Sequence, residues 1–222
     1  MKAAALAIFT ILIYSHNACS QNNKWTVKAG EGIKESVPDS LKFRYPKFVT
    51  GYVYFRDGKN SMAPLNYNLL NGEMEFIARG KDTLSMDNEP TIKVIRINND
   101  SFYYDKVYME LVMSNGSLKL AKKELLKIGH VKKIGASDQS SSTSSITSLS
   151  SYYPELGDLM LIKQTVYYIG DKYNHFLRAN KKNVIKMFGR KQGEIEIFLR
   201  ENKIIFNKED DLKKLVNFLQ KI

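Results

Sequence analysis

Few residues of this chain combine a chemically useful type with a useful spacing. Its histidines are His16, His130 and His175, and none belongs to an H-E-x-x-H pattern. A metal site therefore has little support. A serine hydrolase has little support either, because no G-x-S-x-G elbow occurs in the sequence. We expect no catalytic residues, no metal and no cofactor.

Two pairs of carboxylates are close enough in the sequence to be considered as the acid and base of a glycosidase. They are Glu73 with Glu75, and Glu194 with Glu196. Residues two apart share one face of a strand, so the first pair is expected on the solvent side of a hairpin. In a helix the same spacing points the two side chains apart. Neither arrangement encloses a glycosidic bond between an acid and a base, so the sequence predicts a protein that is not an enzyme.

Tyrosine is the residue type that stands out, with 13 in the chain. Strand alternation places Tyr52 and Tyr54 on one face, and Phe102 and Tyr104 on one face. We nominate Tyr52, Tyr54 and Tyr104 as ligand-facing residues of an aromatic groove for a lipid, glycan or peptide. The alternative is ordinary cross-strand aromatic packing, which the pattern favours.

The first twenty residues have the layout of a secretory signal peptide. Met1 and Lys2 are followed by the apolar run 3–14 and by a polar stretch that ends in small residues. The apolar run is too short for a membrane helix. Cleavage after Ser20 would leave Gln21 as the first residue. Two alternatives stay open: lipidation of Cys19, although His16 and Asn17 fit a lipobox badly, and an uncleaved anchor.

Composition indicates a globular chain without disulfides. Hydrophobic residues make up 43% of the 222 residues, and Cys19 is the only cysteine. The formal net charge is +11. An anionic partner would explain this charge, but a solvated lysine-rich surface explains it better. Because the lysines are dispersed and the protein is expected to be exported, we expect no nucleic acid as a partner.

The pattern from 46 to 135 predicts an antiparallel β body. Before it, the polar segment 21–45 is expected to be a mobile arm or an edge extension that Trp25 tacks onto the body. Asn71-Gly72 and Asn115-Gly116 predict hairpins in which both residues accept positive φ. The alternation after Tyr108 places Met109, Leu111 and Met113 on one face. The predicted strands are 48–56, 64–70, 73–78, 83–86, 92–97, 101–105, 108–114 and 117–121.

The second half of the chain is expected to return to the same sheet. Residues 136–158 form a serine-rich loop, with nine serines between 137 and 151. Residues 159–222 then contribute a β-hairpin that completes the sheet, followed by helices at 181–188, 192–201 and 208–221. We expect Asn180 and Asn207 to cap the first and third helix. A linker between two domains is the alternative interpretation of the serine tract.

The third helix carries an apolar stripe, formed by Leu212, Leu215, Val216 and Leu219, which predicts that it packs on the sheet. The predicted fold class is therefore mainly β (α+β). It is an antiparallel curved sheet or open barrel capped by C-terminal helices.

Two stretches resemble segments of small exported proteins of unknown function from Bacteroidota-type bacteria. They are LNYNLLNGEMEFI (65–77) and FLRENKIIFNKEDDLKKLVNFL (198–219). The resemblance implies an envelope location and no activity.

From the sequence we expect an exported, non-enzymatic binding or interaction protein of the bacterial periplasm, envelope or exterior. The leading hypothesis is an accessory subunit that docks another envelope protein through an exposed strand edge or apolar patch. One alternative is a carrier that holds an apolar ligand or lipid in the curved sheet. Another is an enzyme of unknown type. Membrane association is expected only if Cys19 is lipidated.

Overall fold

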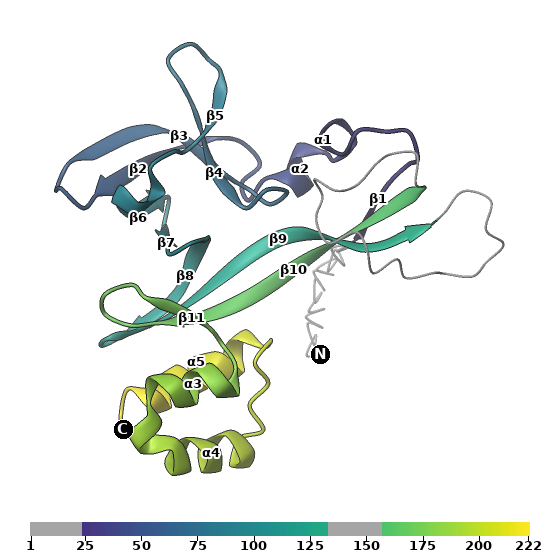
Figure 1. Ribbon diagram of the computed structural model, residues 1–222. Helices are drawn as coiled ribbons and strands as arrows, with labels where there is room; N and C mark the ends of the chain where they lie inside the picture. Colours follow the sequence, from purple (N-terminus) through teal and green to yellow (C-terminus); the bar gives the residue numbers. More distant parts are fainter. Residues whose placement is uncertain (1–23, 133–156) are drawn as a thin grey trace, which may run out of the picture.

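The computed structural model describes residues 24–132 and 157–222. The predicted signal peptide at 1–20 lies outside these residues, and so does the serine-rich loop apart from its last two residues. In the described part, one open antiparallel sheet curves around a core and carries helices at its C-terminal end (Figure 1). The predicted fold class is confirmed. No helix of this part is both long and apolar enough to cross a membrane.

The described residues form eleven strands, of which ten follow one another across the sheet. The strands are β1 (Lys24–Val27), β2 (Val49–Phe55), β3 (Asn60–Asn68), β4 (Glu73–Ile77), β5 (Thr83–Ser85), β6 (Ile92–Ile97), β7 (Asp100–Tyr104), β8 (Tyr108–Asn115), β9 (Leu118–Lys132), β10 (Asp158–Gly170) and β11 (Phe176–Arg178). Their order is β1-β10-β9-β8-β7-β6-β2-β3-β4-β5, and β11 also pairs with β10.

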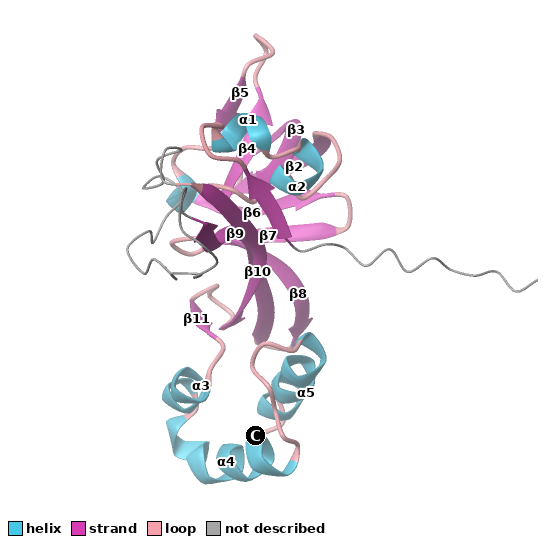
Figure 2. Ribbon diagram, turned by 90° about the vertical axis from the view of Figure 1, so that its right-hand side faces the viewer, coloured by secondary structure: helices cyan, strands magenta, loops and turns pink. Residues whose placement is uncertain are grey.

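Short helices flank the strands. They are α1 (Ile33–Ser36), α2 (Asp39–Lys42), α3 (Lys181–Met187), α4 (Gln192–Glu201) and α5 (Glu209–Leu219), with single 3-10 turns η1 (Glu89–Thr91) and η4 (Gly189–Lys191). Figure 2 shows α3, α4 and α5 gathered at one end of the molecule, opposite the end that holds β2 to β5.

The long pair of β9 and β10 connects these two ends. Its antiparallel register runs from Asp158 opposite Lys132 to Gly170 opposite Lys119. The chain segments before and after residues 133–156 therefore pair directly and belong to one sheet. In Figure 1 this pair runs from beside the helices to β1.

Of the two readings of the segment 21–45, the structure shows the edge extension from Lys24 onward, and the mobile arm is wrong there. β1 pairs with β10, with Trp25 opposite Leu161. The Trp25 indole Nε1 donates to the Ser36 carbonyl at 3.2 Å. Val27 and Val37 are buried. The sequence alone does not identify the strand that β1 pairs with, because that strand lies more than 130 residues further along the chain.

The Asn71-Gly72 turn is longer than predicted. β3 ends at Asn68 and β4 begins at Glu73, so four residues connect them and not two. Only Gly72 has positive φ, at 75°. The Gly72 amide donates to the Asn68 carbonyl at 2.9 Å, and the Asn68 side chain accepts from the Leu70 amide at 2.8 Å. These hydrogen bonds close a four-residue loop. Unlike a two-residue turn, this loop does not require Asn71 to adopt a positive φ.

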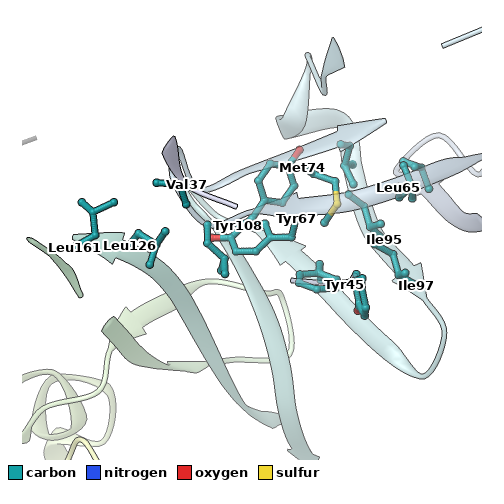
Figure 3. Packing of buried hydrophobic residues seen from close by; sticks show 14 of the residues in the cluster. Val37, Tyr45, Leu65, Tyr67, Met74, Ile95, Ile97, Tyr108, Leu126 and Leu161 are labelled. Atoms are coloured by element: carbon teal, nitrogen blue, oxygen red, sulfur yellow. The ribbon is translucent and has the colours of Figure 1, made fainter. Parts of the chain in front are cut away.

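Two apolar clusters stabilise the two ends. The first, the β core, lies within the curled sheet and includes Val37, Leu65, Met74, Ile95 and Phe102 among its fully or nearly fully buried members. Figure 3 shows members of this cluster from several strands and from the segment before β2, among them Val37, Leu65, Met74, Ile95 and Leu126. Strands that are far apart in the sheet order share this core because the sheet curls.

The second cluster, the helical core, lies where α5 packs on β8 and β9. Leu212, Leu215, Val216 and Leu219 are buried there against Leu120 of β9, among others. The predicted apolar stripe and its packing on the sheet are confirmed.

The helix caps are partly as predicted. Asn180 caps α3, since its side chain accepts from the Asn183 amide at 2.8 Å. Asn207 does not cap α5: Lys208 occupies the N-cap position, and no side chain caps it. In the first turn of α5, the Asp211 carboxylate accepts a hydrogen bond from the Ile205 amide at 3.1 Å. This bond joins the helix to the segment between α4 and α5.

The predicted common face of Met109, Leu111 and Met113 is interrupted. The register between β8 and β9 shifts between Leu111 and Met113. Met109 packs with Ala121 and Phe176, whereas Met113 packs against the helical core. A bulge changes the alternation of side chains, which periodicity alone cannot reveal.

Candidate binding surfaces

The three nominated tyrosines do not form one site. Tyr52 and Tyr54 lie on one face of β2, with ring centroids 6.3 Å apart. Tyr104 packs against the β core, and its ring centroid is 5.0 Å from that of Tyr108. Because Val53 and Phe102 both pair with Ile95, the core face of the sheet carries Phe102 and Tyr104, and the opposite face carries Tyr52 and Tyr54.

Tyr52 and Tyr54 belong to an exposed group that we call the outer-face patch: Tyr52, Tyr54, Met62 and Arg96. Tyr52 is flanked by Met62 on β3 and by Arg96 on β6 in the sheet register. The Arg96 guanidinium lies 5.5 Å from the centroid of the Tyr54 ring. Tyr52 is 45% exposed and Met62 is 61% exposed, so the two form adjacent apolar surface on neighbouring strands.

The charge next to this patch is positive. Arg96 is exposed, and so is Lys93, which lies in the β6 bulge opposite Tyr54 and Phe55. Sequence reasoning missed Met62 and Arg96, because their place beside Tyr52 depends on the pairing of β2 with two other strands. A correct hairpin register for 49–65 would have found Met62.

On the core side, an apolar groove of about 650 Å³ opens at the end of the curled sheet. Val53 and Phe55 contribute from β2, Phe76 and Ile77 from β4, and Ile92 from β6. The other lining residues are Ser61, Met62, Ala63, Pro64, Ala78, Arg79, Met86 and Asp87. The volume is in the range of small-molecule sites. The groove is open to solvent, so it differs from the enclosed cavity that a carrier of the lipocalin type would have.

A cluster of charges lies between β7, β8, β9 and the segment before β2. The Arg44 Nε and Nη2 donate to the two carboxylate oxygens of Glu110 at 2.8 and 3.3 Å. Lys122 Nζ lies 3.4 Å from Glu110, and Arg44 lies 3.7 Å from Asp100. The Tyr45 hydroxyl donates to Asp100 at 2.6 Å. Every group has a partner, so this arrangement fixes the chain before β2 onto the sheet.

The pKa values in this cluster follow from the same contacts. Burial alone would raise the pKa of Glu110, but the hydrogen bond and charge of Arg44, together with Lys122, hold it below its ordinary value of 4.5. The hydrogen bond to Glu110 raises the pKa of Arg44. The lowered pKa of Glu110 and the raised pKa of Arg44 both stabilise the charged forms of the two side chains. The pair is therefore a structural contact and not a proton-transfer group.

Acid is expected to destabilise the fold through Glu110. Because its folded-state pKa is lower than its unfolded one, the stabilisation is fully present above about pH 5 and is lost as the pH falls through the folded pKa. Urea unfolding at pH 7 and pH 4 checks this. The free energy of unfolding should fall less between pH 7 and pH 4 in Glu110→Gln than in the unchanged protein. An equal fall in both proteins would contradict the role of Glu110.

The two histidines weighed for catalysis lie near opposite ends of the β9–β10 pair. The His175 Nδ1 lies 3.3 Å from Asp171, but the His175 side chain is 78% exposed in a turn and lines neither groove nor pocket. His130 lies on β9, opposite Met160. In the described part of the chain, no group of three or more His, Cys, Asp and Glu side chains could hold a metal ion.

The two carboxylate pairs have structural partners. Asn71 Nδ2 donates to Glu73 at 3.0 Å and to Glu75 at 3.5 Å, so that pair braces the β3–β4 turn. In α4, Glu194 pairs with Lys191 and Glu196 with Lys181, both at 2.9 Å. These contacts explain the carboxylates without a substrate.

A second hollow, of about 400 Å³, lies beside β10 near the start of α3 and is lined by Thr165, Tyr167, Arg178, Asn180 and Asn207, among others. Its lining is more polar than that of the groove. Tyr167 lies within 3.5 Å of Glu209, and Asn180 is already engaged as a helix cap. These contacts assign the hollow to the junction between sheet and helices.

Comparison with protein-family models, with curated proteins and with solved structures gave no match for this chain. Its function is therefore inferred from the surfaces of the chain itself.

Proposed function

We propose that this chain is an exported, non-enzymatic interaction protein of the bacterial envelope, and that it docks another protein through the outer-face patch. The single observation that carries this proposal is the exposure of Tyr52 and Met62 next to Arg96. Tyrosine, methionine and arginine are enriched in the centres of protein interfaces, and tyrosine and arginine dominate their binding energy.

The chemistry of the patch defines the partner surface. Tyr52, Tyr54 and Met62 offer an apolar centre that a partner would remove from water. Arg96 and Lys93 add positive charge beside it, in a chain whose formal net charge is +11. The complementary partner surface has an apolar centre and acidic residues around it, since such complementarity increases the rate and specificity of docking.

Export and envelope location rest on the sequence of residues 1–20 and on the resemblance of 65–77 and 198–219 to exported proteins. Because Cys19 lies in the predicted signal peptide, membrane attachment depends on whether it is lipidated.

Substitution in the outer-face patch tests this function. Tagged protein carrying Tyr52→Ala or Arg96→Glu is compared with unchanged protein in pull-downs from solubilised envelopes, with mass spectrometry of retained proteins. We expect a stoichiometric protein partner whose affinity falls about 30-fold with Tyr52→Ala, which corresponds to about 2 kcal/mol for an interface hot spot.

The matched control is Tyr173→Ala, which removes an equally large and 63% exposed tyrosine from the β10–β11 turn. It should leave partner binding unchanged. A partner that is retained equally by all variants would place the interface elsewhere, and the absence of any stoichiometric partner would contradict the docking function.

The second candidate function is a carrier of an apolar ligand, and the observation that favours it is the 650 Å³ apolar groove. Mass spectrometry of lipids in the same pull-down addresses it directly. The groove and the outer-face patch share Met62 but otherwise consist of different residues.

A further inference from the structure

The groove has a lining that suits one flexible hydrocarbon chain. Val53, Phe55, Phe76, Met86 and Ile92 line it from four separate parts of the chain, and all are at least partly withdrawn from water. At on the order of 30 Å³ for each water-sized group, about 20 such groups fit into 650 Å³. This is enough for a single acyl chain with part of its headgroup and too little for two long chains.

Two charges of opposite sign also line the groove. Arg79 follows β4 and Asp87 follows β5, and both are exposed. Within residues 24–132 and 157–222, neither forms an ion pair with another side chain. Among the residues that the structure describes, the one hydrogen bond to the Asp87 carboxylate comes from the neighbouring Asn88 amide, at 2.8 Å. One cation and one anion therefore remain available to a ligand.

From this combination we infer that the groove binds a single-chain amphiphile with a zwitterionic headgroup, in which a phosphate meets Arg79 and an ammonium meets Asp87. The guanidinium is suited to phosphate oxygens and a carboxylate to an ammonium donor. An anionic headgroup would satisfy Arg79 but would place a negative charge near Asp87. This inference depends on the carrier candidate and is independent of docking through the outer-face patch.

The chain offers a control of the same sign for each charge. Lys81 and Asp82 are exposed, lie in the same β4–β5 connection as Arg79 and do not line the groove. Replacing them changes the net charge as much as replacing Arg79 or Asp87 does. A general electrostatic effect would therefore appear in both sets of variants, whereas a specific site would respond only to Arg79 and Asp87.

Isothermal titration tests the inference with lysophosphatidylethanolamine below its micelle-forming concentration. Lysophosphatidic acid with the same acyl chain is the anionic comparison. We expect saturable 1:1 binding of the zwitterionic probe, several-fold tighter than of the anionic one. Affinity should rise about two- to fourfold for each added methylene until the groove is filled, in accordance with the free energy of methylene burial.

Variants define the site. Arg79→Ala should weaken both probes about tenfold, Asp87→Asn should remove the preference for the zwitterionic one, and Lys81→Ala and Asp82→Asn should change neither property. Ser61→Phe introduces a ring at an exposed lining position and should abolish binding, with an unchanged circular-dichroism spectrum as the check on folding.

Three results would overturn the inference: no saturable binding, equal binding by the two headgroups, or the same affinity in Arg79→Ala as in Lys81→Ala. Failure here leaves the docking proposal standing, because none of these substitutions lies in the outer-face patch. Conversely, Tyr52→Ala should weaken docking about 30-fold and leave lipid binding unchanged.

Discussion

Replacement of Glu110 by alanine is expected to lower the free energy of unfolding by about 3 kcal/mol. The Glu110 side chain is only 10% exposed and holds Arg44 through two hydrogen bonds. Its removal leaves the Arg44 guanidinium, 30% exposed, with Asp100 at 3.7 Å as its remaining ion-pair partner. A charge that is largely desolvated and poorly paired is more destabilising than the loss of the contact itself.

Urea unfolding at pH 7 measures this effect, and two variants control it. The double variant Arg44→Leu with Glu110→Leu removes both charges, so it should recover much of the lost stability. Glu194→Ala breaks the exposed pair with Lys191 and should change stability little. A loss below about 1 kcal/mol in Glu110→Ala would show that the cluster is solvated and does not hold the chain before β2.

The second large effect is expected at the helical core. Leu215→Ala should lower the free energy of unfolding by about 3 kcal/mol, because Leu215 is fully buried between α5 and the sheet. The truncation leaves a cavity that α5 cannot close easily, since Leu212 and Leu219 fix the helix on either side. The matched control is Lys214→Ala, one residue before Leu215 on α5, with a side chain that is 63% exposed. It should change the free energy of unfolding little.

Hydrogen exchange locates where Leu215→Ala acts. The helical core and the β core have no residue in common, so the amides of α3, α4 and α5 should lose protection while those of β2 and β6 keep it. Uniform loss of protection across both ends would contradict this. It would show that the long β9–β10 pair couples the two cores into one cooperative unit.

Local patterns were sufficient for most elements. The strand around 92–97 and the helix at 192–201 have the same bounds in sequence and structure. Asn180 caps its helix, and the Leu212 stripe packs on the sheet. These features depend on neighbours within a few residues, where alternation, capping and helical periodicity act directly.

The prediction of the candidate sites from sequence was much less complete. Tyr52 and Tyr54 were nominated and lie on one face, with Tyr52 exposed and Tyr54 half-buried, but Tyr104 packs against the β core on the other. Whether any of the three binds a ligand stays a prediction. Periodicity gives the relative face of residues within one strand, while the relation between faces of different strands requires their register.

By itself, the sequence determined the fold class, the order of most elements and the absence of a familiar catalytic motif, because each depends on residue types at short spacing. Only the tertiary structure decided three features that join distant segments. It paired β1 with β10, placed Arg44 on Glu110, and set Met62 and Arg96 beside Tyr52. Such contacts arise from strand register and sheet curvature, which are set by the packing of the whole core and leave no local signal in the chain.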